Sequence, residues 1–145
     1  MLFRSFPEGR HAPIAAEDQA RVIAAILAEP SAHVGKTYPL YGAKELSHDE
    51  IAEAVGRVLG NPLRYEHVSM DDFARLLGPD PSVAGGSSTT GRGANQVLLQ
   101  HLREVALDHK DGLFAGTNDL VARIGGRAPI TVEAFVEKHR AAFAP

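Results

Sequence analysis

The most constraining feature of this sequence is an amphipathic helix that carries its own start and stop signals. Ser47 and Glu50 have the spacing of a capping box, in which each side chain satisfies a backbone N–H at the helix start. Gly60 is placed to end the helix, and Pro62 forbids its continuation. The helix is amphipathic because apolar residues form one stripe along it: Ile51, Val55, Val58 and Leu59.

Other elements before and after this helix set the fold class. A helix is predicted from about Ala16 until Pro30 closes it, and its apolar face needs a partner layer. Residues 36–41 (Lys-Thr-Tyr-Pro-Leu-Tyr) and residues 64–68 have the pattern of short strands. Pro39 donates no ladder hydrogen bond, so the first strand is expected at a sheet margin. The order helix, strand, helix, strand predicts an α/β fold, mostly helical with a few short strands.

The rest of the chain contains one long loop and several helices. Ser69 and Asp72 indicate a helix start that covers residues 73–77. Residues 78–93 are rich in Gly, Pro, Ser and Thr and predict a flexible loop. Three further helices are expected: one marked by Val97, Leu98, Leu102 and Val105, one over residues 118–124, and one that Thr131 caps, with Phe135, Val136 and Phe143 as its apolar positions. All 145 residues fit one domain.

Composition narrows the classes of partner. The formal net charge is -3, so no basic excess is available to hold phosphates, and nucleic acid is not an expected partner. The sequence has no cysteine, which excludes disulfides and thiolate chemistry and suits a reducing cytosol. No apolar run approaches the roughly 20 residues that span a bilayer. We therefore expect a cytoplasmic protein that does not insert in membranes, with a small-molecule or protein partner.

Three segments, in order, resemble the NmrA-like branch of the atypical short-chain dehydrogenases/reductases, an NAD(P)-binding family. The first runs from Gly9 to Ala20 and contains Arg-His-Ala-Pro-Ile and the acid Asp18. The second has a Gly-Lys-x-Tyr stretch at residues 35–38 and a Leu-Ser-x-x-Glu-Ile-Ala helix start at residues 46–52. The third is Leu-Phe-Ala-Gly-Thr-Asn-Asp-Leu at residues 113–120, followed by Gly126-Arg127-Ala128-Pro129 and Phe135.

The resemblance implies that the chain is the C-terminal portion of such a fold. Residues 36–41 would then form the far edge of a Rossmann-type sheet, and residues from Ser47 onward would build the small domain that closes over the substrate. The glycine-rich turn that seats a pyrophosphate is missing, since Gly91-Arg92-Gly93 lacks the third glycine and follows no strand. Tyr41 and Lys44 are also one residue too close for a Tyr-x-x-x-Lys pair.

We therefore expect the chain alone to have no catalytic residues and no cofactor, with NAD(P) bound only if a complete fold is assembled. The expected substrate-binding residues are Arg10, His11 and Pro13, because the resemblance places this stretch at the edge of the substrate cleft; a surface turn with a charged rim is the alternative. No metal site is expected, since no two histidines have the helical spacing that places two ligands on one face.

Two functions remain open at this point. The chain is either the substrate-binding and closing portion of an NAD(P)-dependent oxidoreductase or a free-standing NmrA-like binding or regulatory protein without enzymatic activity. Exposed strand edges and apolar helix faces tend to find another chain. We therefore expect either a homodimer or a partner that supplies the missing Rossmann half.

Overall fold

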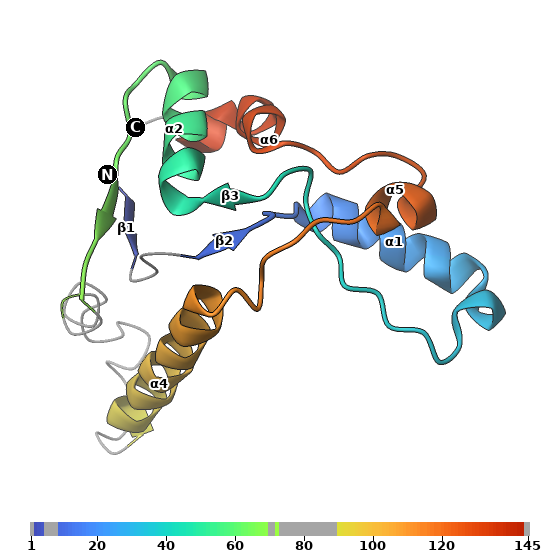
Figure 1. The fold of residues 1–145 in the computed structure, drawn as a ribbon, viewed down its shortest axis with the longest axis horizontal. Coiled ribbons are helices and arrows are strands. Elements are labelled where there is room, and N and C mark those ends of the chain that lie inside the picture. The colour runs from blue at the N-terminus through green and yellow to red at the C-terminus, as the bar shows by residue number, and fades with distance from the viewer. Residues whose placement is uncertain (1, 5–8, 70–71, 73–89, 144–145) are drawn as a thin grey trace.

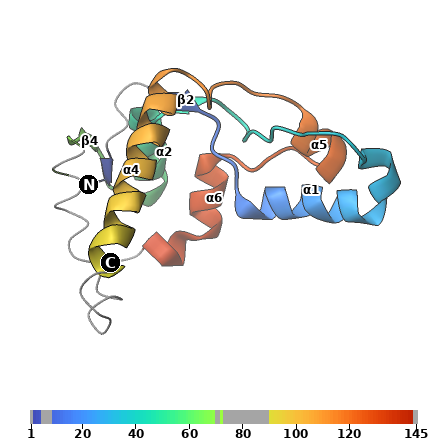
Figure 2. The same cartoon turned by 90° about the horizontal axis from the view of Figure 1, so that it is seen from below.

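The computed structural model describes residues 2–4, 9–69, 72 and 90–143. Two helix pairs carry most of the packing: α1 (Ala16–Ala28) lies against α5 (Leu120–Gly125), and α2 (His48–Leu59) lies against α6 (Val132–Lys138). Both pairs are visible in Figures 1 and 2. The long helix α4 (Thr90–Lys110) extends away in Figure 1 and contacts the short strand β2 (Arg10–His11).

The strands form two separate two-stranded sheets. β1 (Leu2–Arg4) pairs in parallel with β4 (Tyr65–His67), and β2 pairs in antiparallel with β3 (Leu46–Ser47). Short 3₁₀ turns, η1 (Pro30–His33) and η3 (Arg140–Phe143), follow α1 and α6. The predicted α/β class, mostly helical with a few short strands, is confirmed.

The capping predictions are confirmed in detail. The Glu50 backbone N–H donates to Ser47 Oγ at 3.2 Å, and the Ser47 N–H donates to Glu50 Oε2 at 2.8 Å. Gly60 ends α2 in the left-handed conformation, with a φ of 70° that glycine adopts without steric cost. Thr131 caps α6 by accepting the Ala134 N–H at 3.1 Å. Asp72 likewise donates its N–H to Ser69 Oγ, while residues 73–77 lie outside the described residues.

The predicted strand over residues 36–41 is wrong. Its polar groups find partners outside any sheet: the Lys36 N–H donates to the His33 carbonyl at 3.2 Å, and the Pro39 carbonyl accepts Asn118 Nδ2 at 2.8 Å. The Tyr38 hydroxyl bonds His33 Nδ1 at 2.8 Å. These contacts replace ladder hydrogen bonds, in a segment where Pro39 has no N–H to offer.

Two boundaries also differ from the prediction. Residues 90–93 were expected to end the loop that begins at residue 78, but they form the first turn of α4. A nucleated helix readily extends over neighbouring residues, so the loop composition did not prevent this. Residues 78–89 lie outside the described residues. The last helix stops at Lys138, so Phe143 lies in η3 instead.

The core lies where the two helix pairs bury small apolar side chains. Val22 on α1 and Val121 on α5 are 1% and 0% exposed. In the second pair, Val136 on α6 and Ala52 and Val55 on α2 are buried. Each fully buried valine contributes roughly 1.5 kcal/mol or more of transfer free energy. None of the helices among the described residues is long and apolar enough to cross a membrane.

A buried carboxylate joins α1 to the segment between α5 and α6. Asp18 is 1% exposed; it pairs with Arg21 and accepts the Ile130 N–H at 2.8 Å. Arg21 in turn donates to the Gly125 carbonyl at 2.6 Å. The sequence predicted Asp18 in the first turn of a helix. The structure shows in addition that its carboxylate is buried and bonded to both Arg21 and the Ile130 N–H.

Replacing Asp18 with alanine should lower the free energy of unfolding by about 3 kcal/mol, since it leaves a half-buried guanidinium and a backbone N–H without their acceptor. Urea denaturation measures this loss. Asp119→Ala is the matched control: its ion pair with Arg123 is exposed, with side chains 68% and 66% accessible, and its loss should cost less than about 1 kcal/mol. Equal losses for the two variants would contradict a central role for Asp18.

Glu17 should give the fold a measurable pH dependence. The hydrogen bond from Lys138 on α6 lowers the pKa of the Glu17 carboxyl below its usual 4.5. Since the folded pKa is the lower one, this contact stabilises the protein above pH 4.5 and the stabilisation disappears as the pH falls through the folded pKa. Glu17→Gln should therefore lower Tm at neutral pH and leave it unchanged in strong acid. In a Lys138→Met background the same substitution should have a much smaller effect at neutral pH.

Candidate functional site

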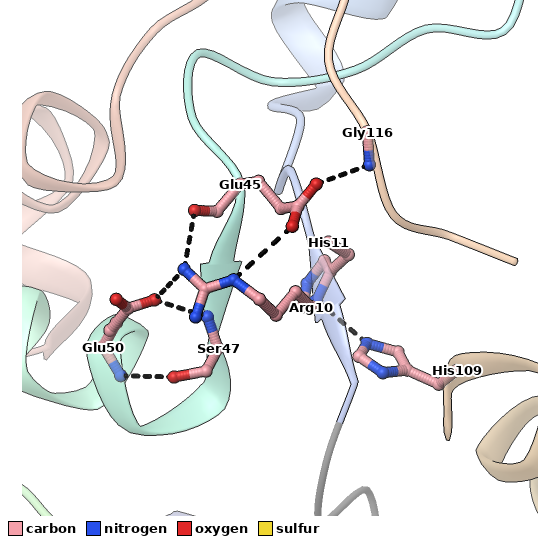
Figure 3. Close-up of polar contacts among 7 residues, drawn as sticks. All are labelled: Arg10, His11, Glu45, Ser47, Glu50, His109 and Gly116. Carbon is pink, nitrogen blue, oxygen red and sulfur yellow. Dashed lines mark hydrogen bonds and ion pairs between the residues drawn. The ribbon is translucent and has the colours of Figure 1, made fainter. Parts of the chain in front are cut away.

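Arg10 on β2 lies between the carboxylates of Glu45, next to β3, and Glu50, on α2; these three residues form a carboxylate clamp. In the antiparallel register Arg10 faces Ser47 and His11 faces Leu46. The Arg10 Nη2 donates to Glu50 Oε2 at 2.6 Å and to the Glu45 carbonyl oxygen at 3.3 Å, and its Nε lies 3.4 Å from Glu45 Oε1 (Figure 3). The guanidinium charge is thus balanced by two carboxylates.

The two carboxylates of this clamp have second partners. The Ser47 backbone N–H, followed by the charge of Arg10, lowers the pKa of the Glu50 carboxyl, so Glu50 is ionised at neutral pH. Glu45 Oε2 accepts the Gly116 N–H at 2.6 Å, which ties the segment after α4 to β3 (Figure 3). Gly116 has a φ of 118° and lies against the Tyr41 ring, a conformation in which a side chain would be strained.

Three histidines converge beside the clamp. His11 comes from β2, His48 is the first residue of α2, and His109 lies in the last turn of α4. His109 Nε2 and His11 Nδ1 are 3.0 Å apart (Figure 3). The ring centroids of the three residues are 4.9 to 5.2 Å apart, and the Tyr65 ring stacks on His48 at 5.0 Å.

The position of His109 depends on the absence of a side chain at Gly9. A Cβ built at Gly9 would lie 1.4 Å from His109 Nδ1, so any other residue there would displace the imidazole. His109 is 7% exposed, and this burial lowers its pKa below 6.5. The ring is therefore held as neutral imidazole at pH 7.

Pro13 lies on the wall of two hollows. One has a volume of about 240 Å³ and charged residues in its lining, among them Lys44, Glu53 and Arg57. The other has a volume of about 250 Å³ and is apolar, lined by Ile14, Ile51, Val55, Phe135 and other side chains. Pro13 and residues 130–132 border both hollows.

The predicted site residues therefore lie in three different environments. Arg10 is held by Glu45 and Glu50, His11 joins the histidine cluster, and Pro13 borders the hollows. The expectation that no metal site exists rested on spacing within single helices. The cluster of His11, His48 and His109 spans three elements, so no short-range spacing could have indicated it.

Neither α1 nor α2 offers a seat for a pyrophosphate. The N-terminal turn of α1 contains Glu17 and the buried Asp18, and the N-terminus of α2 is closed by its capping box with Glu50. At α2 the capping box uses the N-terminal N–H groups, and at α1 two carboxylates lie in the first turn, where an anion would have to bind. Gly91 and Gly93 lie within helix α4 and do not form a loop after a strand. A dinucleotide does not fit these residues.

The chain is similar in sequence to part of a longer NAD(P)H-dependent enzyme. No family model matches it. It is 29% identical over 136 residues to an NAD(P)H azoreductase of Xenophilus azovorans, a match that covers 94% of this chain and 43% of the azoreductase. The chain thus spans less than half the length of this curated relative.

Solved structures show the same relation. The NADPH complex of a quinone oxidoreductase from Escherichia coli matches 99% of this chain and 45% of its own, with a TM-score of 0.71 and 20% identity. A nucleoside-diphosphate-sugar epimerase from Staphylococcus aureus matches 93% of this chain and 43% of its own, with a TM-score of 0.69 and 23% identity. The expected resemblance is confirmed: the chain is similar to the C-terminal part of NAD(P)-linked reductases with a Rossmann-type fold.

Proposed function

We propose that this chain forms the substrate-binding and closing part of an NmrA-like NAD(P)H-dependent reductase, in which residues outside these 145 bind the nucleotide. The carrying observation is that nearly the whole chain matches less than half of an NAD(P)H azoreductase. The acidic N-termini of α1 and α2 support the same division, because they leave the dinucleotide to be bound elsewhere.

The two hollows suggest where substrate lies. Pro13 borders both the charged hollow and the apolar hollow. A molecule with a flat apolar body and a polar end would place its body in the apolar hollow and its polar end in the charged one. Arg10 already has two carboxylate partners, so it orients β2 and β3 and does not supply a free charge to the ligand. We propose an azo compound or a quinone as the electron acceptor, as the names of two similar proteins suggest.

A chimera tests this function. The chain would replace the matching residues of the Xenophilus azovorans azoreductase, and the chimera should reduce an azo dye with NADPH. Ile14→Arg puts a charge into the apolar hollow and should lower kcat/KM for the dye by about tenfold or more without changing the KM for NADPH.

Leu113→Arg is the matched control, because Leu113 is 66% exposed and does not border the apolar hollow. Unchanged dye kinetics in the Ile14→Arg chimera would reject the hollow as the substrate site. Micromolar binding of NADPH to a single copy of the isolated chain would reject the proposal that residues outside these 145 bind the nucleotide.

A second candidate is a free-standing, homo-oligomeric NmrA-like binding protein. Apolar residues exposed along one end of the molecule favour it: Ile23 and Leu27 on α1 are 55% and 71% accessible, and Val34 after η1 is 79% accessible. Such a surface is normally covered by another protein layer. In the reductase, the nucleotide-binding part would cover it; in the alternative, a second copy would.

Light scattering of the purified chain separates these candidates. If a second copy covers α1, the protein should have the mass of a dimer at micromolar concentration, and Leu27→Glu together with Ile23→Glu should convert it to a monomer. Leu107→Glu, at an exposed position of α4, is the control and should leave the dimer intact. A strict monomer at high concentration would exclude the homo-oligomer.

A further inference from the structure

We propose that His11, His48 and His109 form a binding site for a divalent transition-metal ion of the zinc class. Each residue offers one imidazole nitrogen, and these three nitrogens all lie within 4.8 Å of one another. The proposed reductase function does not require this site, so a failed test of one proposal does not contradict the other.

The distances suit a metal ion after small side-chain rotations. Zinc–nitrogen bonds of about 2.0–2.1 Å in a tetrahedral site place the ligand nitrogens roughly 3.3 Å apart. His109 Nε2 and His11 Nδ1 are already 3.0 Å apart, and an ion between them would replace their mutual hydrogen bond. His48 completes the set from the first residue of α2, within the 4.8 Å limit.

The surroundings hold the three rings near this arrangement. Gly9 leaves space for His109, the stacked Tyr65 supports His48, and the β2–β3 pairing fixes the backbone of His11. Ligands held in place before binding reduce the entropy that an ion must overcome.

The charge of Arg10, beside the cluster, is balanced by two carboxylates. Arg10 is adjacent to His11 in the sequence and would repel an ion if its charge were unbalanced. Glu50 and Glu45 both pair with its guanidinium, at 2.6 Å and 3.4 Å, and neutralise it. Three protein nitrogens leave a fourth tetrahedral position, which water or a ligand oxygen would occupy.

Binding would link parts of the chain that are distant in sequence. His11 lies on β2, His48 begins α2 and His109 ends α4, so one ion would fasten the C-terminal end of α4 to the β2–β3 sheet and to α2. An ion that binds the folded chain and not the unfolded chain must also raise Tm.

The test is titration of the metal-free full chain with Zn²⁺ by calorimetry and with Co²⁺ by visible absorption. We expect one equivalent to bind with a micromolar or lower Kd, a rise in Tm, and the absorption bands of tetrahedral Co²⁺. Replacing His11, His48 or His109 with alanine should weaken binding by about tenfold or more, whereas His101→Ala, at an exposed position of the same helix α4, should not.

A measurement on the unmodified chain covers the case in which an alanine variant does not fold. NMR of the histidine rings should show Zn²⁺ shifting the signals of His11, His48 and His109 and leaving those of His33 and His139 in place. Absence of saturable binding, or equal shifts at all histidines, would mean that the three rings form a hydrogen-bonded aromatic cluster only and would overturn the proposal.

Discussion

The architecture depends on one enclosed negative charge. Asp18 is buried at the start of α1, where Arg21 neutralises it and the Ile130 N–H bonds it. A charge without partners would not remain in such a place, so the segment between α5 and α6 must pass close to α1. This segment also leads into α6, which packs against α2 and contains the buried Val136. The Asp18 carboxylate, together with the ion pair of Glu17 and Lys138, therefore joins the two helix pairs.

Sequence signals predicted the elements that have local causes. The capping box of Ser47 and Glu50, the glycine end at Gly60 and the Thr131 cap were readable because their partners lie within one helical turn. The predicted strand over residues 64–68 is also present, as β4 (Tyr65–His67). β2 and β3 were not predicted, because they contain two residues each, too few to show an alternating pattern. Residues 36–41 have the composition of a strand but find their partners in His33 and Asn118.

The candidate site was predictable only in part. Arg10, His11 and Pro13 were selected through a family resemblance, and the structure places them beside a clamp, a histidine cluster and two hollows. Their partners Glu45, His48 and His109 lie between 35 and 98 residues away in the sequence, and no periodicity connects them to residue 10 or 11. Such contacts arise from tertiary folding alone.

Pro13 and residues 130–132 act as a shared partition between the charged and the apolar hollow. A molecule that displaces this partition from one side changes the volume available on the other. An occupant of one hollow that shifted these residues would change the affinity of the other hollow, and the second occupant would then change the affinity of the first by the same factor. Ile130 belongs to this partition, and its N–H donates to Asp18, so the carboxylate that joins the helix pairs also anchors the partition.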